Sequence, residues 1–204
     1  MFRALTIARE FGSGGADVGR AIAGRLGWKL LDKAFIESVA RAAHVEPQLA
    51  RRFDERTDSW LERIARGGLW RSFEGIVAVS EPAIFDAETM ASLARNVIRE
   101  AYQAGPCVIV GRGAQCVLQY HPDVFHAFIY APWHERVTRV RQRLPEEKNV
   151  EELIRSMDQQ RADFTRTYFG SDWKDPHLYH VMISSGLGED VTAAQIIELI
   201  ASGG

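Results

Sequence analysis

Residues 4–26 read ALTIAREFGSGGADVGRAIAGRL and hold three elements in a fixed order. Residues 4–8 form a short apolar run with β-branched side chains, which is typical of a buried strand. The stretch GSGG at 12–15 is too rich in glycine for the interior of a helix or strand. From Val18 onward, apolar residues return at every fourth position as far as Leu26, which predicts an amphipathic helix. Strand, glycine-rich loop and helix in this order indicate the opening of an α/β nucleotide-binding unit.

The rest of the chain continues this alternation of strands and helices. Apolar runs predict further strands at 28–31, 106–110, 124–131 and 178–184. Helical periodicity predicts helices at 33–43, 87–101, 133–144 and 150–168, and a final helix capped by Asp190 or Thr192. Residues 46–85 alternate charged and aromatic side chains and have the character of a helical insertion. Strands separated by helices imply an α/β fold in which a parallel sheet forms the middle of three layers.

The amino-acid composition limits which classes of function we expect. The chain has 204 residues, of which 46% are hydrophobic and 25% charged, as in an ordinary globular domain. Its 25 basic and 27 acidic residues give a net charge of −2, so we expect neither nucleic acid nor a membrane surface as a partner. The two cysteines form no CxxC pair, which argues against a structural zinc site. With no signal-peptide pattern at the N-terminus, we expect a single cytoplasmic domain over residues 1–204.

The glycine-rich loop is a candidate phosphate site. The N-terminus of a helix offers unpaired N–H groups and the positive end of a dipole. Glycines let the backbone curl so that successive N–H groups point at one anion. We therefore expect a phosphate to be bound by Gly12, Ser13, Gly14, Gly15 and Ala16. A tight turn that binds no ligand is the alternative.

The loop departs from the Walker A pattern GxxxxGK[ST]. Aligned from the strand, the first glycine of that pattern falls on Arg9, its lysine on Gly15, and its hydroxyl positions on Ala16 and Asp17. Arg9 could supply the missing positive charge; its alternative role is a salt bridge to Glu10 or Asp32. Asp17 is a candidate Mg²⁺ ligand, directly or through water, and its alternative role is to stabilise the start of the helix.

Two further arginines have informative positions. Arg112 follows the apolar strand 106–110 within Gly-Arg-Gly, and ligands of open α/β sheets bind at such strand ends. A guanidinium there can grip a phosphate with two hydrogen bonds, or it can be a surface turn residue. Arg161 shares a helix face with Met157 and Phe164, so it points inward. A charge on an inward face either pairs with a carboxylate or contacts an anionic ligand.

At this point the chain resembles the cytidylate kinase-like proteins, whose glycine loop reads like SREYGSGG and lacks the Walker lysine. The likeness is carried by LTIAREFGSGGADVGRAIAGRLGWKLLDKAFI (5–36), VIVGRGAQCVLQYHPDVFHAFIYAPWHERVTRV (108–140) and DQQRADFTRTYFGSDWKDPHLYHVMISS (158–185). The resemblance implies a P-loop nucleoside monophosphate kinase-like fold, with a helical insertion at 44–85 on the substrate side and a lid at 161–175. It also implies ATP and Mg²⁺ as cofactors, and lid arginines that clamp the transferring phosphoryl group at Arg161.

The acceptor side departs from the family. Cytidylate kinases carry LLDSGAIYR where this chain has LLDKAFIES, so Asp32 matches, while Lys33 and Ser38 replace the serine and arginine that hold cytidine monophosphate. In the Gly-Arg-Asp segment of the family Arg112 matches, but the aspartate is Gly113. The resemblance therefore implies Asp32, Lys33 and Ser38 as acceptor-binding residues with an altered acceptor preference.

Three hypotheses follow. The first is an enzyme that transfers a phosphoryl group from ATP to a nucleoside monophosphate or another phosphate-bearing small molecule, with Arg9, Arg112 and Arg161 as catalytic residues. The second is a regulatory module that keeps the fold and binds nucleotide or phosphate without turnover, which the absent lysine and hydroxyl favour. The third is an interaction protein that uses the tryptophan-bearing insertion and binds no nucleotide. Association of identical chains through the insertion stays open.

Overall fold

The computed structural model describes residues 1–32 and 87–203. The chain divides into two compact units, residues 1–32 with 105–204, and residues 33–104. The expected helix at 33–43, the expected insertion at 44–85, and the candidate residues Lys33 and Ser38 lie outside the described residues. Within the described ranges, no helix is both long enough and apolar enough to cross a membrane.

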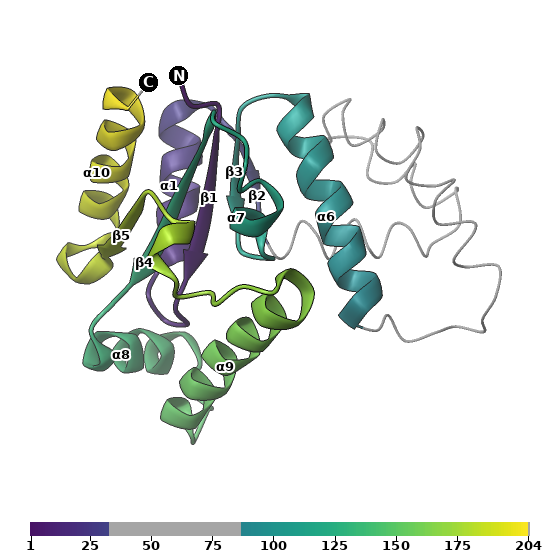
Figure 1. The fold of residues 1–204 in the computed structure, drawn as a ribbon. Coiled ribbons are helices and arrows are strands. Elements are labelled where there is room, and N and C mark those ends of the chain that lie inside the picture. The colour runs from purple at the N-terminus through teal and green to yellow at the C-terminus, as the bar shows by residue number, and fades with distance from the viewer. Residues whose placement is uncertain (33–86, 204) are drawn as a thin grey trace, which may run out of the picture. The chain divides into compact units, whose positions relative to one another are not determined.

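The larger unit is built on a five-stranded sheet whose strands all run parallel. The strands lie in the order β2-β3-β1-β4-β5, so the first strand is central (Figure 1). In the register of the sheet, Ala4 of β1 lies beside Cys107 on one side and Val124 on the other. The bounds are β1 (Ala4–Arg9), β2 (Lys29–Leu31), β3 (Cys107–Val110), β4 (Val124–Tyr130) and β5 (Val181–Ser184). The predicted α/β fold with a parallel sheet is confirmed.

Helices follow the strands, as the periodicity predicts. The larger unit has α1 (Gly15–Leu26), α7 (Ala114–Val117), α8 (Trp133–Arg143), α9 (Val150–Phe169) and α10 (Glu189–Ser202), and the 3₁₀ helices Pro176–Leu178 and Ser185–Leu187. The described part of the other unit is α6 (Ala87–Ala104). Its apolar positions predicted from the sequence are buried, among them Ala91, Ala94, Val97, Ile98 and Ala101.

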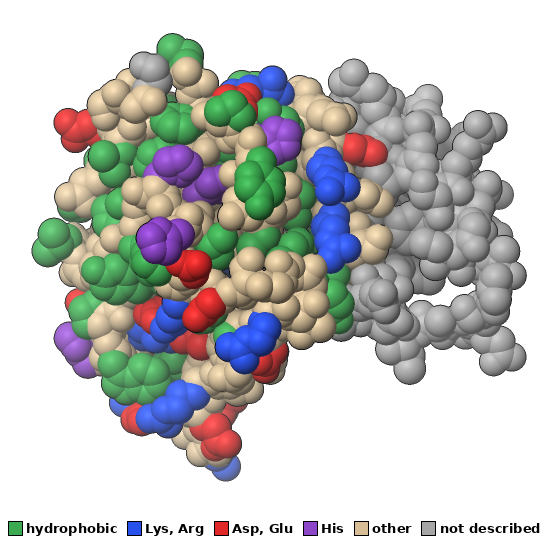
Figure 2. All heavy atoms as spheres, in the orientation of Figure 1, with side chains coloured by type: hydrophobic (Ala, Val, Ile, Leu, Met, Phe, Trp, Pro, Cys, Tyr) green, Lys and Arg blue, Asp and Glu red, His purple; other side chains and the backbone are tan. Residues whose placement is uncertain are grey.

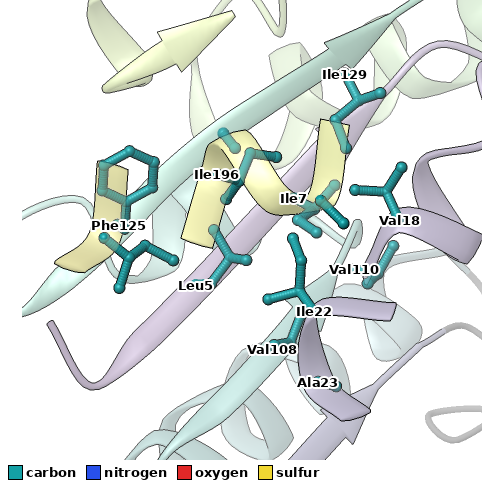
Figure 3. Close-up of a cluster of buried hydrophobic side chains, with 13 residues drawn as sticks. Leu5, Ile7, Val18, Ile22, Ala23, Val108, Val110, Phe125, Ile129 and Ile196 are labelled. Atoms are coloured by element: carbon teal, nitrogen blue, oxygen red, sulfur yellow. The ribbon is translucent and has the colours of Figure 1, made fainter. Parts of the chain in front are cut away.

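The main core lies between the sheet and the pair α1 and α10. Side chains from β1, β3 and β4 point toward Val18 and Ile22 of α1 and Ile196 of α10 (Figure 3). Val18 and Ile22 are fully buried, and burial of each such side chain contributes about 1.5–3 kcal/mol. Gly19 lets α1 approach the sheet closely, because a Cβ there would lie 2.8 Å from Cγ2 of Val110. This packing fixes the start of α1 at the carboxyl end of β1.

Two predicted element boundaries are wrong. The last helix is not capped by Asp190 or Thr192: it begins at Glu189, with Gly188 as its N-cap at φ 107. The Thr192 hydroxyl instead donates to the carbonyl oxygen of Gly188 at 2.8 Å, from inside the first turn. The last strand begins at Val181 rather than at residue 178, because residues 176–178 form a 3₁₀ helix whose start is capped by Asp175.

Candidate functional site

Three sequence-predicted residues follow or end neighbouring strands at one edge of the sheet. Arg9 ends β1, Asp32 follows β2, and Arg112 follows β3. Because the strands are parallel, their carboxyl ends lie at the same edge, which is where open α/β sheets bind ligands. The glycine-rich loop leaves β1 at this edge and leads directly into α1.

The loop has the backbone conformation of an anion-binding turn. Gly12 and Gly14 have φ of 80° and 75°, and Gly14 is the N-cap of α1. The N–H of Ser13 donates to the carbonyl oxygen of Glu10 at 3.3 Å, which closes the turn. Among the described residues, the N–H groups of Gly12, Gly14, Gly15 and Ala16 have no hydrogen-bond acceptor. Four unsatisfied donors at the positive end of a helix form a suitable phosphate site.

Arg9 lies against the residue that stands in place of the Walker lysine. A Cβ at Gly15 would lie 2.8 Å from Cβ and 3.0 Å from Cδ of Arg9. At Gly111 an added Cβ would meet Nη1 of the same arginine. The stem of Arg9 therefore runs over the start of α1, and its guanidinium ends beside the loop after β3. The two glycines leave space for this one long side chain.

Positive charge is concentrated around Arg9. The pKa of the Arg9 guanidinium is lowered to about 9, chiefly by burial and also by the nearby charges of Arg161 and Arg112, against the opposing charge of Asp32. The alternative salt bridge to Glu10 is absent among the described ion pairs, where Glu10 pairs with Arg136 and Lys174. Three arginines close together favour an anionic ligand at this position.

Arg112 has a strained backbone. Its φ is 58°, between 82° at Gly111 and 71° at Gly113, and it is the only non-glycine residue with positive φ among the residues described. A left-handed conformation at a residue with a Cβ costs on the order of 1–3 kcal/mol and is concentrated at functional sites. The ring of Phe169, at the end of α9, occupies the space that a Cβ at Gly113 would need. The end of α9 thus packs directly on this second glycine-rich turn.

The predicted inward direction of Arg161 is confirmed, and the structure also gives it protein partners. It is partly buried, whereas Arg155 and Arg166 on the same helix are exposed. Its Nη1 donates to the carbonyl oxygen of Arg9 at 2.7 Å and lies 3.8 Å from Oδ1 of Asp158. Burial lowers the pKa of Arg161, which Asp158 counteracts. Arg161 therefore holds the end of β1, and its contact with a transferring phosphoryl group stays a prediction.

Both carboxylate oxygens of Asp17 have cationic partners. Oδ1 accepts from Arg20 at 2.7 Å, and Oδ2 accepts from Arg143. Burial opposes the ionisation of Asp17, but the hydrogen bonds from Arg143 and Arg20 outweigh it and lower its pKa. In the part of the chain that the structure describes, no group of three or more His, Cys, Asp or Glu could hold a metal ion. Magnesium commonly uses one or two carboxylates together with waters and substrate phosphates, so a contact with Asp17 through water stays a prediction.

The structure adds residues that the sequence did not single out. The carboxylate of Glu189 lies where a Cβ of Gly14 would stand. The Ser185 hydroxyl donates to the carbonyl oxygen of Ser13 at 2.5 Å, and Arg139 donates to that hydroxyl at 3.1 Å. Both contacts join the loop to the far end of the sequence, at the junction of β5 and α10. No local pattern marks them, because their partners are brought together only by the fold.

A charged cluster on α8 and α9 also adjoins the loop. Arg136 of α8 is 5% exposed and pairs with Asp158 of α9 and, at 3.1 Å, with Oε2 of Glu10. Lys174 completes the cluster at 2.8 Å from Oε1 of Glu10. Acidic and basic side chains gather side by side over these two helices (Figure 2). Asp158 lies on the same inward face as Arg161, so helical phase was the one signal that could have found it.

Comparisons with known proteins agree with this architecture. The model of the "Cytidylate kinase-like family" matches residues 4–187. An uncharacterized protein from Eubacterium ventriosum ATCC 27560 has a solved structure that is similar over 99% of both chains, with a TM-score of 0.71 and 23% identity.

Two shikimate kinases are more distant structural neighbours. Shikimate kinase from Bacteroides thetaiotaomicron has a TM-score of 0.52 and 15% identity, over 97% of this chain and 98% of that chain. Shikimate kinase from Acinetobacter baumannii, in complex with shikimate, has a TM-score of 0.51 and 17% identity, over 100% of this chain and 95% of that chain. These likenesses show a shared kinase-like α/β fold. No curated protein matches the chain.

Proposed function

The chain belongs to the cytidylate kinase-like family, and from this we propose that it is a phosphotransferase that moves the terminal phosphoryl group of ATP to a nucleoside monophosphate. Within this proposal the glycine-rich loop binds the phosphates of the donor. Asp32 lies on the acceptor side, where Lys33 and Ser38 are expected to alter acceptor choice relative to cytidylate kinases.

One observation carries the proposal: Arg9 lies against Gly15, next to four unsatisfied N–H groups. The β- and γ-phosphates of a nucleotide carry charge that must be balanced during transfer. The residue that normally balances it is absent from the loop, but the stem of Arg9 crosses the same position. The buried guanidinium of Arg9, which lies beside Gly111 in the loop after β3, is a preorganised cation, so it would stabilise developing charge without a large rearrangement.

Each residue then has a distinct task. The N–H groups of Gly12, Gly14, Gly15 and Ala16 hold the donor phosphates, and Arg9 neutralises the charge between them. Ser13, which the sequence also predicts to bind phosphate, instead donates its N–H and its hydroxyl to the carbonyl oxygen of Glu10. Arg112 grips an anionic oxygen from the β3 end of the sheet, and Arg161 adds positive charge from α9. When bound, Mg²⁺ neutralises charge on the phosphate oxygens, and Asp17 would hold it through water. Transfer of this kind depends on positioning and electrostatics rather than on a covalent group of the protein.

The acceptor class needs a direct test, because kinases with this fold differ in what they phosphorylate. The structural neighbours include kinases named for shikimate, and a gluconokinase from Sinorhizobium meliloti 1021. The family favours a nucleoside monophosphate over shikimate and gluconate. Acceptors of both kinds therefore belong in the same assay.

A regulatory nucleotide-binding module is the second candidate. It is favoured by Gly15 and Ala16, which supply neither a lysine nor a hydroxyl, and by the two arginines that occupy the carboxylate of Asp17. Such a module would bind ATP at the same loop and release it unchanged.

An ADP-release assay separates the two candidates. Purified protein is given ATP and Mg²⁺ with each nucleoside monophosphate, shikimate or gluconate, and ATP binding is measured by calorimetry. Arg9→Ala is the test variant, and Arg3→Ala, at the opposite end of β1, is its control. We expect turnover with a nucleoside monophosphate that Arg9→Ala removes and Arg3→Ala keeps. ATP binding without turnover would favour the regulatory module, and no binding at all would reject both.

A further inference from the structure

Phe11, at the start of the glycine-rich loop, is held by α8 and α9 through its backbone and its ring. Its N–H donates to Oδ1 of Asp158 at 2.7 Å, and its carbonyl oxygen accepts from Nε of Arg136 at 2.8 Å. Its ring packs against an apolar cluster from the same two helices, made of Val137, Val140, Val150 and Ile154. Both polar backbone groups and the side chain of this loop residue therefore have partners on α8 and α9.

The guanidinium of Arg136 is fixed on every side. Besides its bond to Phe11, it donates through Nη2 to Oδ2 of Asp158, and its Nη1 lies 3.1 Å from Oε2 of Glu10. Arg136 is only 5% exposed. Hydrogen bonds between charged groups are stronger and hold their geometry better when they are shielded from water. The pair Arg136–Asp158 thus holds the backbone of Phe11 between its two members.

The next residue of the loop lies directly on α8. A Cβ at Gly12 would be 2.9 Å from the carbonyl oxygen of Arg136 and 3.0 Å from Cγ2 of Val140. The loop therefore has two parts. Residues 10–12 contact α8 and α9, and the N–H groups of Gly12, Gly14, Gly15 and Ala16 have no acceptor among the described residues, whereas that of Ser13 is bonded to Glu10. Gly12, with a φ of 80°, turns the backbone between these parts.

We propose that Arg136 and Asp158 are positioning residues, which hold the phosphate-binding loop in the shape that accepts a polyphosphate. The inference rests on the proposed function and extends it, because it makes nucleotide affinity depend on the attachment of α8 and α9 to the loop. N–H groups converge on one anion only while the backbone on either side of Gly12 is held. Without the contacts of Arg136 and Asp158, Phe11 and Gly12 regain conformational freedom. Ligand binding must then remove this freedom, which lowers the affinity.

The test compares two conservative substitutions with two matched controls. Asp158→Asn keeps the shape of the side chain but turns an amide toward Arg136, and Arg136→Lys keeps the charge but loses the bond from Nε to Phe11. The controls are Arg141→Lys and Glu151→Gln, an exposed pair at 3.9 Å that also joins α8 to α9 but does not touch the loop. Thermal unfolding of each variant identifies a temperature at which all five proteins are folded.

Two measurements are made at that temperature: hydrogen exchange of the amides of residues 10–16 without ligand, and calorimetric binding of inorganic tripolyphosphate and of ATP. We expect both test variants to exchange these amides faster and to bind both ligands about 10-fold more weakly, with the controls unchanged. Test variants that are less heat-stable but keep wild-type affinity when folded would overturn the inference, as would unchanged exchange.

The failure of the proposed function would look different. If the wild-type protein binds tripolyphosphate and loses that affinity in both test variants, but never turns over ATP, the positioning role stands and the kinase proposal fails. If the wild-type protein binds neither tripolyphosphate nor ATP, the loop is not a phosphate site, and both proposals are overturned.

Discussion

The stem of Arg9 occupies the space that a Cβ would need at Gly15, the first residue of α1. A side chain at that position and the present path of the arginine exclude each other. The relationship shows how the stem of Arg9 crosses the position of the missing Walker lysine and carries its guanidinium to Gly111, in the loop after β3. It also means that the loop and the end of β1 must be considered as one unit when substitutions are planned.

Gly15→Ala and Gly24→Ala are expected to have opposite effects on stability, although both glycines lie in α1. A Cβ at position 24 meets nothing within 4 Å, so alanine there should raise the free energy of unfolding by about 0.5–1 kcal/mol. A Cβ at position 15 overlaps Arg9, so alanine should lower it by about 1–3 kcal/mol and weaken ATP binding. Urea unfolding and calorimetry measure both effects. Equal stability changes at the two positions would show that Arg9 moves aside without cost.

Arg161→Ala is expected to lower turnover more than ATP affinity, whereas Arg9→Ala lowers both. Arg9 adjoins the loop in the resting protein, while a contact of Arg161 with the phosphoryl group would form mainly in the transition state. Loss of such a cationic donor typically costs about 100-fold in kcat. Steady-state kinetics and calorimetry on both variants test this, with the exposed Arg166→Ala as the control on the same helix. If both variants keep the wild-type kcat and the wild-type ATP affinity, neither arginine replaces the missing Walker lysine.

Asp17→Asn is expected to raise the Mg²⁺ concentration needed for half-maximal activity by about tenfold, as found when groups that support a metal are removed. The carboxylate must then exchange part of its contact with Arg20 or Arg143 for a water on the metal. A magnesium titration of activity measures the effect, with Asp190→Asn at the start of α10 as the control. If the magnesium titration is unchanged but the thermal stability is lower, Asp17 only stabilises the start of α1 and does not take part in metal binding.

Stability is expected to fall in mild acid because of His126. Its pKa is lowered from 6.5 to about 4, chiefly by burial and in smaller part by the neighbouring His180. The folded protein keeps His126 neutral while the unfolded chain takes up a proton below pH 6.5. The free energy of unfolding should therefore drop by about 3 kcal/mol as pH falls from 6.5 to 4.

Denaturant unfolding at several pH values checks this. His126→Leu should lower the free energy of unfolding by the same amount at every pH, because it loses the 2.6 Å hydrogen bond to Thr6. It should also make the free energy of unfolding fall less steeply between pH 6.5 and 4. The exposed His134→Leu, on α8, is the control and should keep the wild-type slope. An acid limb in His126→Leu as steep as in the wild type would assign the sensitivity to other groups, of which His180 and His121 are the titratable neighbours.

Local patterns were sufficient for the central part of the fold. The strand, the glycine-rich loop and α1 follow from apolar periodicity and from the conformations that only glycine adopts easily, and both are properties of neighbouring residues. The inward direction of Arg161 followed from helical phase in the same way. The start of α10 did not, since Gly188 caps it through backbone geometry rather than through a side-chain oxygen.

The rest of the site depends on contacts between distant segments. Arg136 has the sequence context of a surface residue on a charged helix, yet it is buried because Glu10 and Asp158 supply its counter-charges. Ser185 looks like an ordinary residue after a strand, and only the sheet order brings it to Ser13. Such partners cannot be identified from spacing along the chain.

The contact between Ser185 and Ser13 has a consequence for the order in which the protein becomes functional. The loop is complete early in synthesis, but two of its contacts come from much later in the chain. The hydroxyl that donates to the carbonyl oxygen of Ser13 belongs to the 3₁₀ helix Ser185–Leu187, and the carboxylate beside Gly14 belongs to α10. Until residue 189 has left the ribosome, the glycine-rich loop of the nascent chain lacks its contacts with Ser185 and Glu189. Nucleotide binding should therefore begin late in folding, after Ser185 and Glu189 have reached the glycine-rich loop.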